Sequence, residues 1–115
     1  MHIIYVEDNP NDRRFVERVL TSQDHQITTG RGLDEVSAVI READIILIDI
    51  LLDGEPKGSR YPEQLREMGI EVPCIAVTAR VTRDEAKDYL ASGFHHVLPK
   101  PFTAVQLVDL IENFS

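Results

Sequence analysis

Short apolar runs alternate with amphipathic stretches along the whole sequence, and this alternation is the main guide to the fold. The run Ile45-Ile46-Leu47-Ile48 is apolar at every position, as expected for a central parallel strand that is buried on both faces. The stretch from Gln26 to Thr29 gives the weakest strand signal. Together the apolar runs predict strands at 3–6, 26–29, 45–48, 73–77 and 96–98.

Each apolar run is followed by a segment with helical periodicity. Asn9 and Pro10 are typical of a helix start, as cap and first-turn residues. Two later pairs with capping-box spacing predict the starts of the fourth and fifth helices, and the fourth ends near Gly93. These pairs are Thr82 with Glu85 and Thr103 with Gln106. The expected apolar faces hold Phe15, Val16, Val19 and Leu20; Leu33, Val36, Val39 and Ile40; Tyr61, Leu65 and Met68; and Leu107, Val108 and Ile111.

Five strands alternating with five helices favour an α/β fold with a parallel sheet between two helical layers. The chain is too short for a barrel of eight such units. We therefore expect a flavodoxin-like (βα)5 doubly wound sheet with strand order 2-1-3-4-5. At this length, residues 1–115 should form one domain.

Charge narrows the possible partners. Twelve basic and twenty acidic residues give a net charge of −8. Direct binding to nucleic acid or to an anionic membrane is therefore not expected, because both require clustered Lys and Arg. The sequence shows no leader and no membrane-spanning run. Cys74 is the single cysteine, which excludes an internal disulfide, and it is expected to be a small buried residue. A cytoplasmic protein is expected.

Polar residues stand at the carboxyl ends of four predicted strands, where ligands bind in open parallel sheets. Glu7 and Asp8 follow the first strand, Asp49 the third, Thr78 the fourth and Lys100 the fifth. Singly, each could be a helix-end, turn or surface residue. Their joint placement predicts one site at this edge of the sheet.

Electrostatics indicates what such a site requires. Two like charges about 4 Å apart repel by about 4 kcal/mol at an effective dielectric near 20. Three clustered carboxylates should therefore take up protons or recruit a cation. The expected ligands are hard oxygens, which favour Mg²⁺ over Zn²⁺. With Mg²⁺ and one lysine the formal charge becomes −3 + 2 + 1 = 0, which lets an anionic phosphoryl group approach.

The same residues resemble the response-regulator receiver family of two-component signalling over essentially the whole chain. The resemblance is carried by Glu7-Asp8-Asn9, by Asp49-Ile50-Leu51-Leu52 with Gly54 and Gly58, by Val77-Thr78-Ala79 and by Leu98-Pro99-Lys100-Pro101-Phe102. It implies that Asp49 accepts a phosphoryl group from a sensor histidine kinase or a phosphotransfer protein. Phosphorylation would then shift the domain between inactive and active states.

The resemblance also assigns roles at the site. Asp8, Asp49 and the backbone carbonyl of Leu51 would bind Mg²⁺, and Glu7 would act through a metal-bound water. Lys100 and Thr78 would contact phosphoryl oxygens, and the Lys100–Pro101 peptide bond would be cis. The chain would catalyse only its own phosphorylation and dephosphorylation, so no enzyme with a separate substrate is expected. It would be a monomer or a weak homodimer with an unknown downstream protein target.

Two positions flanking the site bear on regulation. The family usually has Tyr or Phe three residues before the lysine, where this chain has Val97, which favours a plain strand-core role and puts aromatic switching in doubt. Arg80, two residues beyond Thr78, is either a residue that overhangs the site or a solvated charge, and the hypothesis is that it alters phosphoryl lifetime.

Three alternatives remain at this stage. The first is a receiver-like adaptor that docks on proteins without phosphorylation. The second is a phosphohydrolase of the haloacid dehalogenase type, which would need an Asp at the position of Leu51. The third is a flavin carrier, which would not place Glu7-Asp8-Asn9-Pro10 where a phosphate binds.

His95 and His96 are adjacent strand residues that should point to opposite faces, so a shared metal is not expected.

Overall fold

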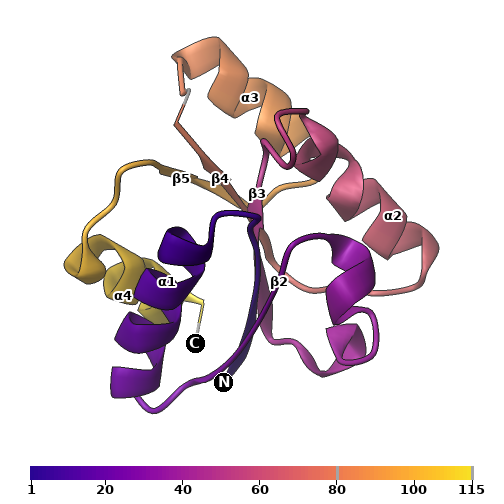
Figure 1. The fold of residues 1–115 in the computed structure, drawn as a ribbon. Helices are drawn as coiled ribbons and strands as arrows, with labels where there is room; N and C mark the ends of the chain where they lie inside the picture. The colour runs from indigo at the N-terminus through magenta and orange to yellow at the C-terminus, as the bar shows by residue number, and fades with distance from the viewer. Residues whose placement is uncertain (80, 115) are drawn as a thin grey trace.

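Five parallel strands form a single sheet in the order β2-β1-β3-β4-β5 (Figure 1). The computed structural model describes residues 1–79 and 81–114. The strands are β1 (His2–Val6), β2 (Gln26–Gly30), β3 (Ile45–Asp49), β4 (Cys74–Thr78) and β5 (His96–Pro99). The predicted flavodoxin-like α/β fold and its strand order are therefore confirmed.

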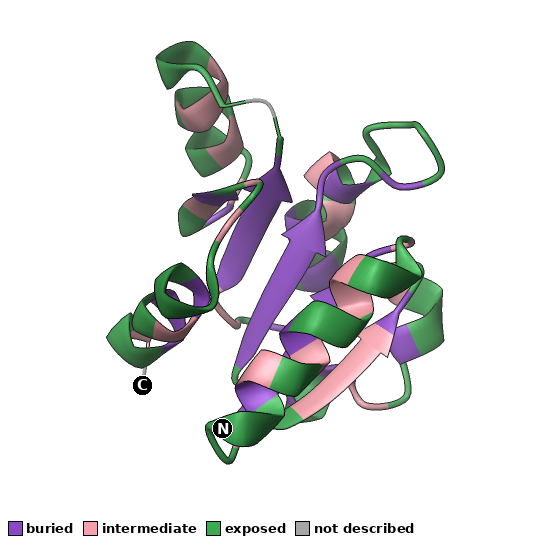
Figure 2. Cartoon of the chain, turned by 60° about the vertical axis from the view of Figure 1, so that its left-hand side comes forward, coloured by how far each residue is buried: buried purple, intermediate pink, exposed green. Residues whose placement is uncertain are grey.

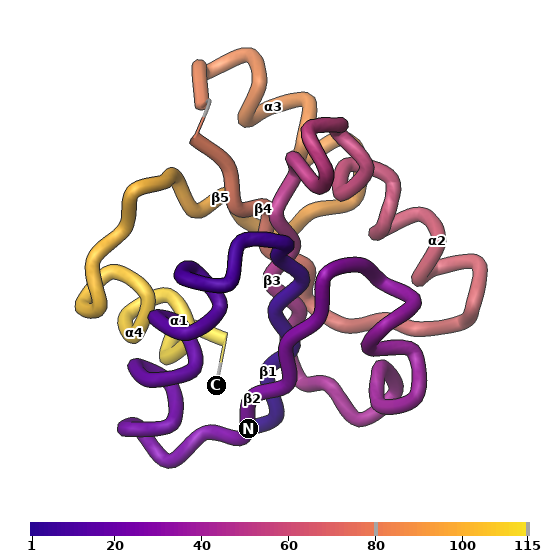
Figure 3. The backbone as a smooth tube through the Cα atoms, in the orientation of Figure 1, coloured from indigo at the N-terminus to yellow at the C-terminus, as the bar shows by residue number. Residues whose placement is uncertain are grey.

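Helices cover both faces of this sheet. On one face lie α1 (Pro10–Ser22) and α4 (Ala104–Asn113), which are side by side in Figures 1 and 3. The other face is covered by α2 (Tyr61–Glu67) and α3 (Arg83–Ala91), together with the short 3-10 helices that follow β2. In the described part of the chain, no helix is both long and apolar enough to cross a bilayer.

The three inner strands form the centre of the core. Every residue of β1, β3 and β4 is buried, whereas most of the edge strand β2 is only half-buried (Figure 2). Successive residues of β1 point to opposite faces, so Ile4 belongs to the core cluster on the α2 side of the sheet and Tyr5 to the cluster on the side of α1 and α4. This rigid centre holds the carboxyl ends of the strands in fixed positions.

Local capping residues start the helices where the sequence predicts. The Asn9 side chain accepts hydrogen bonds from the backbone N–H groups of Asn11 and Asp12. Thr103 and Gln106 form a reciprocal capping box at the start of α4. Thr82 Oγ1 accepts from the Glu85 N–H at 3.1 Å. These bonds satisfy N–H groups that have no partner inside the helix.

The prediction of an amphipathic α-helix from Leu33 to Ile40 is wrong. The structure has two 3-10 helices instead, η1 (Leu33–Val36) and η2 (Ile40–Glu42). Three of the four expected face residues are β-branched and no side chain caps the first turn, so an α-helix is weakly favoured. The Ser37 hydroxyl also bonds to the Asp34 carbonyl. The burial of Val36 and Ile40 nonetheless follows the expected pattern.

Candidate functional site

Four strand ends meet at one edge of the sheet. Glu7 follows β1, Asp49 ends β3, Thr78 ends β4 and Lys100 follows β5. Glu7, Asp49 and Thr78 are buried, with only 1%, 5% and 4% of their surfaces exposed. The Lys100 N–H donates to the Thr78 carbonyl at 2.8 Å, which extends the β4–β5 ladder to the lysine. The parallel sheet therefore brings together side chains that are far apart in sequence.

The ammonium group of Lys100 is the centre of the site. Its Nζ donates to Asp49 Oδ2 at 2.5 Å and to Glu7 Oε1 at 3.1 Å. A third bond runs to Asp12 Oδ2, also at 3.1 Å. Asp12 was not predicted as a site residue. Its only signal in the sequence is its place four residues after Asp8, in the first turn of a helix that begins at this edge.

The buried carboxylates change the proton affinities of the site. Burial, together with a hydrogen bond and the negative charge of Asp49, raises the pKa of Glu7 to about 9, against the lowering effect of Lys100. Burial would lower the pKa of Lys100, but bonds to Asp49 and Glu7 outweigh it, and the net change is upward. One lysine alone thus does not fully neutralise this group of acids.

The loop after β3 holds the remaining acidic residues in place. Asp8 Oδ2 accepts from the Asp53 N–H at 2.8 Å, which links the β1 loop to the β3 loop. Asp49 Oδ1 accepts from the Leu51 N–H at 3.0 Å, and the Leu51 side chain itself is exposed. Backbone N–H groups thus orient one oxygen of each carboxylate, while the Lys100 ammonium binds the other oxygen of Asp49.

Two predictions about this edge concern the Lys100–Pro101 bond and the metal site. The Lys100–Pro101 peptide bond is cis, as the resemblance implied. Within residues 1–79 and 81–114, no three His, Cys, Asp or Glu side chains already form a cluster of metal ligands, so the Mg²⁺ site remains a prediction. In this arrangement the Lys100 ammonium lies among the carboxylates and offsets part of their negative charge.

The other residues singled out in the sequence have different surroundings. Val97 is half-buried in β5 and packs against the core. Arg80 falls outside the described residues. His95 Nδ1 accepts from the Cys74 N–H at 3.1 Å, whereas His96 is exposed. The two histidines therefore have separate surroundings.

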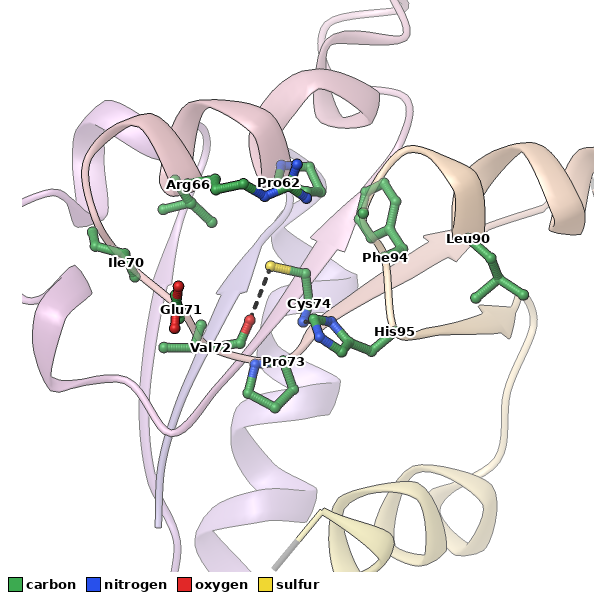
Figure 4. A pocket seen from close by; sticks show the side chains of 12 residues that line it. Pro62, Arg66, Ile70, Glu71, Val72, Pro73, Cys74, Leu90, Phe94 and His95 are labelled. Carbon is green, nitrogen blue, oxygen red and sulfur yellow. Dashed lines mark hydrogen bonds between the residues drawn. The ribbon is translucent and has the colours of Figure 1, made fainter.

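A cavity of about 510 Å³ lies at the opposite, amino-terminal edge of β4 (Figure 4). Arg66, Cys74, Phe94 and His95 are among its lining residues. Cys74 is buried, as predicted, and its Sγ donates to the Val72 carbonyl at 3.6 Å. Burial raises the pKa of this thiol to about 11, so it is neutral at physiological pH. The cavity is separate from the acidic edge.

Comparisons with known proteins agree with this geometry. A family model described as the response regulator receiver domain matches residues 3–112. Among curated relatives, the sensor histidine kinase RcsC of Salmonella typhi is 32% identical over 117 residues, which cover 100% of this chain and 12% of that protein. The chain thus spans only a small part of this relative's length.

Solved structures show the same architecture. The receiver domain of the sensor histidine kinase PA1611 from Pseudomonas aeruginosa PAO1, described with a magnesium ion in its active site cleft, is 28% identical with a TM-score of 0.81; 98% of this chain and 95% of that one are covered. The Vibrio cholerae chemotaxis protein CheY4 has a TM-score of 0.88 at 19% identity, with 99% and 98% covered, and supports the fold alone. Taken with the match over residues 3–112, these likenesses show that the chain belongs to the response regulator receiver domain family of two-component systems.

Proposed function

We propose that residues 1–115 act as one receiver domain in which Asp49 is the phosphoryl acceptor. The observation that carries this proposal is the contact between Lys100 Nζ and Asp49 Oδ2, two groups that are 51 residues apart in sequence. A buried carboxylate with an oxygen facing an ammonium group can act as a nucleophile toward phosphorus. The same ammonium can then stabilise the negative charge that accompanies the transferred group.

The proposed reaction is a transfer between two side chains. An oxygen of Asp49 forms a bond to phosphorus, the phosphorus–nitrogen bond of a phosphohistidine donor breaks, and the electron pair of that bond stays on the imidazole nitrogen. Lys100 would pair with one phosphoryl oxygen, and the Thr78 hydroxyl would donate to another. The chain thus takes part in its own modification and acts on no separate substrate.

The donor set of the site fits Mg²⁺ in its chemistry. Glu7, Asp8 and Asp49 supply only carboxylate oxygens, and Glu7 Oε2 is buried and accepts no hydrogen bond from the described residues. Asp8, Asp49 and the Leu51 carbonyl would hold the ion, with Glu7 acting through a water. Bound Mg²⁺ would offset the charge of the incoming phosphoryl group.

The donor would be a sensor histidine kinase or a phosphotransfer protein, and the similarity to part of the sensor histidine kinase RcsC supports this class of partner. Phosphorylation would shift the chain between two conformations that a downstream protein distinguishes. Because Val97 carries no ring, this switch would not depend on rotation of an aromatic side chain at that position. Arg80 is proposed to modulate the lifetime of the phosphoryl group.

Incubation with acetyl phosphate and Mg²⁺, followed by intact-protein mass spectrometry, tests the assignment of Asp49. We expect a gain of one phosphoryl group in the wild type and in Asp53→Asn, and none in Asp49→Asn. Asp53 is a suitable control because its carboxylate lies in the same loop and is exposed. A wild type that gains no phosphoryl group would favour the adaptor alternative, and a gain that persists in Asp49→Asn would place the acceptor elsewhere.

A further inference from the structure

Asp12 binds the same ammonium group as the two buried carboxylates. It reaches Lys100 from the first turn of α1, although the two residues are 88 positions apart. An ammonium group has three N–H donors. In this structure the three acceptors are Glu7, Asp12 and Asp49, so each donor of Lys100 has a carboxylate partner.

The three partners differ in how easily they can release the lysine. The side chains of Glu7 and Asp49 are only 2% and 7% exposed, whereas that of Asp12 is 44% exposed. A buried carboxylate that loses its partner cannot replace it with water, which is strongly unfavourable. Asp12 can be hydrated when its bond to Lys100 breaks. It is therefore the partner that leaves at the smallest free-energy cost.

We infer that Asp12 is a positioning residue that competes with the incoming phosphoryl group for Lys100 and thereby slows phosphorylation of Asp49. This inference rests on the proposed function of Asp49. For Lys100 to bind a phosphoryl oxygen, one of its three N–H groups must turn away from its present partner. Asp12 gives up that N–H, and its negative charge also opposes the approach of an anionic donor.

A purely structural role for Asp12 is the competing explanation. An acidic residue in the first turn of a helix interacts favourably with the helix dipole, and Asp12 also lies in the turn capped by Asn9. Asp12→Asn keeps the shape of the side chain and removes only the charge. Asp12→Glu keeps the charge and can still reach Lys100. This pair of variants separates the effect of charge from the effect of packing.

The test is the rate of phosphorylation as a function of acetyl phosphate concentration, at saturating Mg²⁺. Asp12→Asn should lower the half-saturating donor concentration roughly three- to tenfold, the range expected when an exposed ion pair and a nearby repulsive charge are both removed. Asp12→Glu should behave like the wild type. Asp109→Asn, which removes an exposed acid from α4, should also match the wild type and controls for net charge. Thermal unfolding of each variant reports any loss of helix stability separately.

The outcomes distinguish this inference from the proposed function. A wild type that is not phosphorylated defeats the assignment of Asp49 and, with it, the role of Asp12. A wild type that is phosphorylated, with an Asp12→Asn variant of equal or weaker donor affinity, overturns the role of Asp12 alone. The role is also overturned if Asp12→Glu strengthens donor binding as much as Asp12→Asn, because the carboxylate charge would then have no influence.

Discussion

Gly58 lies directly against the backbone of Asp49. A Cβ atom at position 58 would overlap the carbonyl oxygen of Asp49 and would also meet the Ile48 side chain at 3.0 Å. The Gly58 N–H donates to the Ile50 carbonyl at 3.1 Å, so the loop after β3 folds back onto the end of its own strand. The position of the proposed phosphoryl acceptor therefore depends on a residue without a side chain nine positions later.

Gly58→Ala should destabilise the protein and displace Asp49. Because the obstructing atoms belong to the backbone, they cannot move aside as a side chain would, and we expect a loss of about 2 kcal/mol in the free energy of unfolding. Urea denaturation measures this loss, and acetyl phosphate labelling should be slower. Gly32→Ala is the matched control, since its Cβ would meet the flexible carboxylate end of Asp34 at 2.9 Å and the Tyr61 hydroxyl at an ordinary contact distance of 3.6 Å, but no backbone atom. Equal stability of the two variants would contradict this account.

Removing the ammonium group should expose the repulsion among the acids. Lys100→Met leaves Glu7 and Asp49 buried without their shared cation, and we expect a loss of about 3 kcal/mol when divalent ions are removed with EDTA. Added Mg²⁺ should raise the melting temperature of this variant more than that of the wild type, because a ligand that binds the folded state stabilises it.

Lys87→Met, which removes an exposed lysine from α3, provides the control for this experiment. It should respond to EDTA and Mg²⁺ as the wild type does. If Lys100→Met proved as stable as Lys87→Met in EDTA, Lys100 would not be the group that balances the buried carboxylates.

Stability should fall at alkaline pH because of Cys74. The pKa of its thiol is raised from 9.0 to about 11 in the folded state, so the unfolded chain releases this proton first. The stability that comes from burying the neutral thiol is fully present below pH 9 and is lost as the pH rises toward 11. The total loss in the free energy of unfolding is about 2 to 3 kcal/mol. Urea denaturation of Cys74→Ala should show a shallower decline between pH 9 and 11 than the wild type. Parallel declines would show that the thiol does not contribute.

Tyr5→Phe should stabilise the protein or leave it unchanged. The Tyr5 hydroxyl is buried beneath the acidic edge and has no hydrogen-bond partner among the described residues. Burial and the charges of Glu7 and Asp49 raise the pKa of this phenol, so it stays neutral. Removing an unsatisfied hydroxyl should gain about 1 kcal/mol, measured by urea denaturation. Tyr89→Phe on α3 is the control, and a clear loss of stability in Tyr5→Phe alone would reveal a bond formed by the hydroxyl in solution.

The sheet and the strand-end residues could be predicted because they follow from local patterns. An apolar run such as Ile45–Ile48 identifies a buried strand, and a parallel sheet brings the carboxyl ends of its strands to one edge. Asp49 and Lys100 are found by this reasoning alone, without knowledge of distances. Their present contact agrees with that prediction, although it does not by itself test their roles.

Asp12 and the segment after β2 could not be predicted in the same way. Whether Asp12 faces Lys100 depends on the rotation of α1 about its axis and on the path of the chain after β5, which no local pattern specifies. The segment from Leu33 to Ile40 has helical periodicity, but its β-branched residues and the Ser37–Asp34 bond favour tighter turns. Here burial of Val36 was predictable and the type of helix was not.

None of the side chains in α3 is buried. Its contacts include the Thr82 cap at its start and the half-buried Tyr89 ring, which packs edge-on against Phe94 with 6.1 Å between the ring centroids near its end. Little apolar surface is exposed to water if this helix detaches, so it should open long before the sheet does. Amide protons of α3 should therefore exchange with deuterium first among the α-helices. A binding partner could change the conformation of this segment at the lowest free-energy cost.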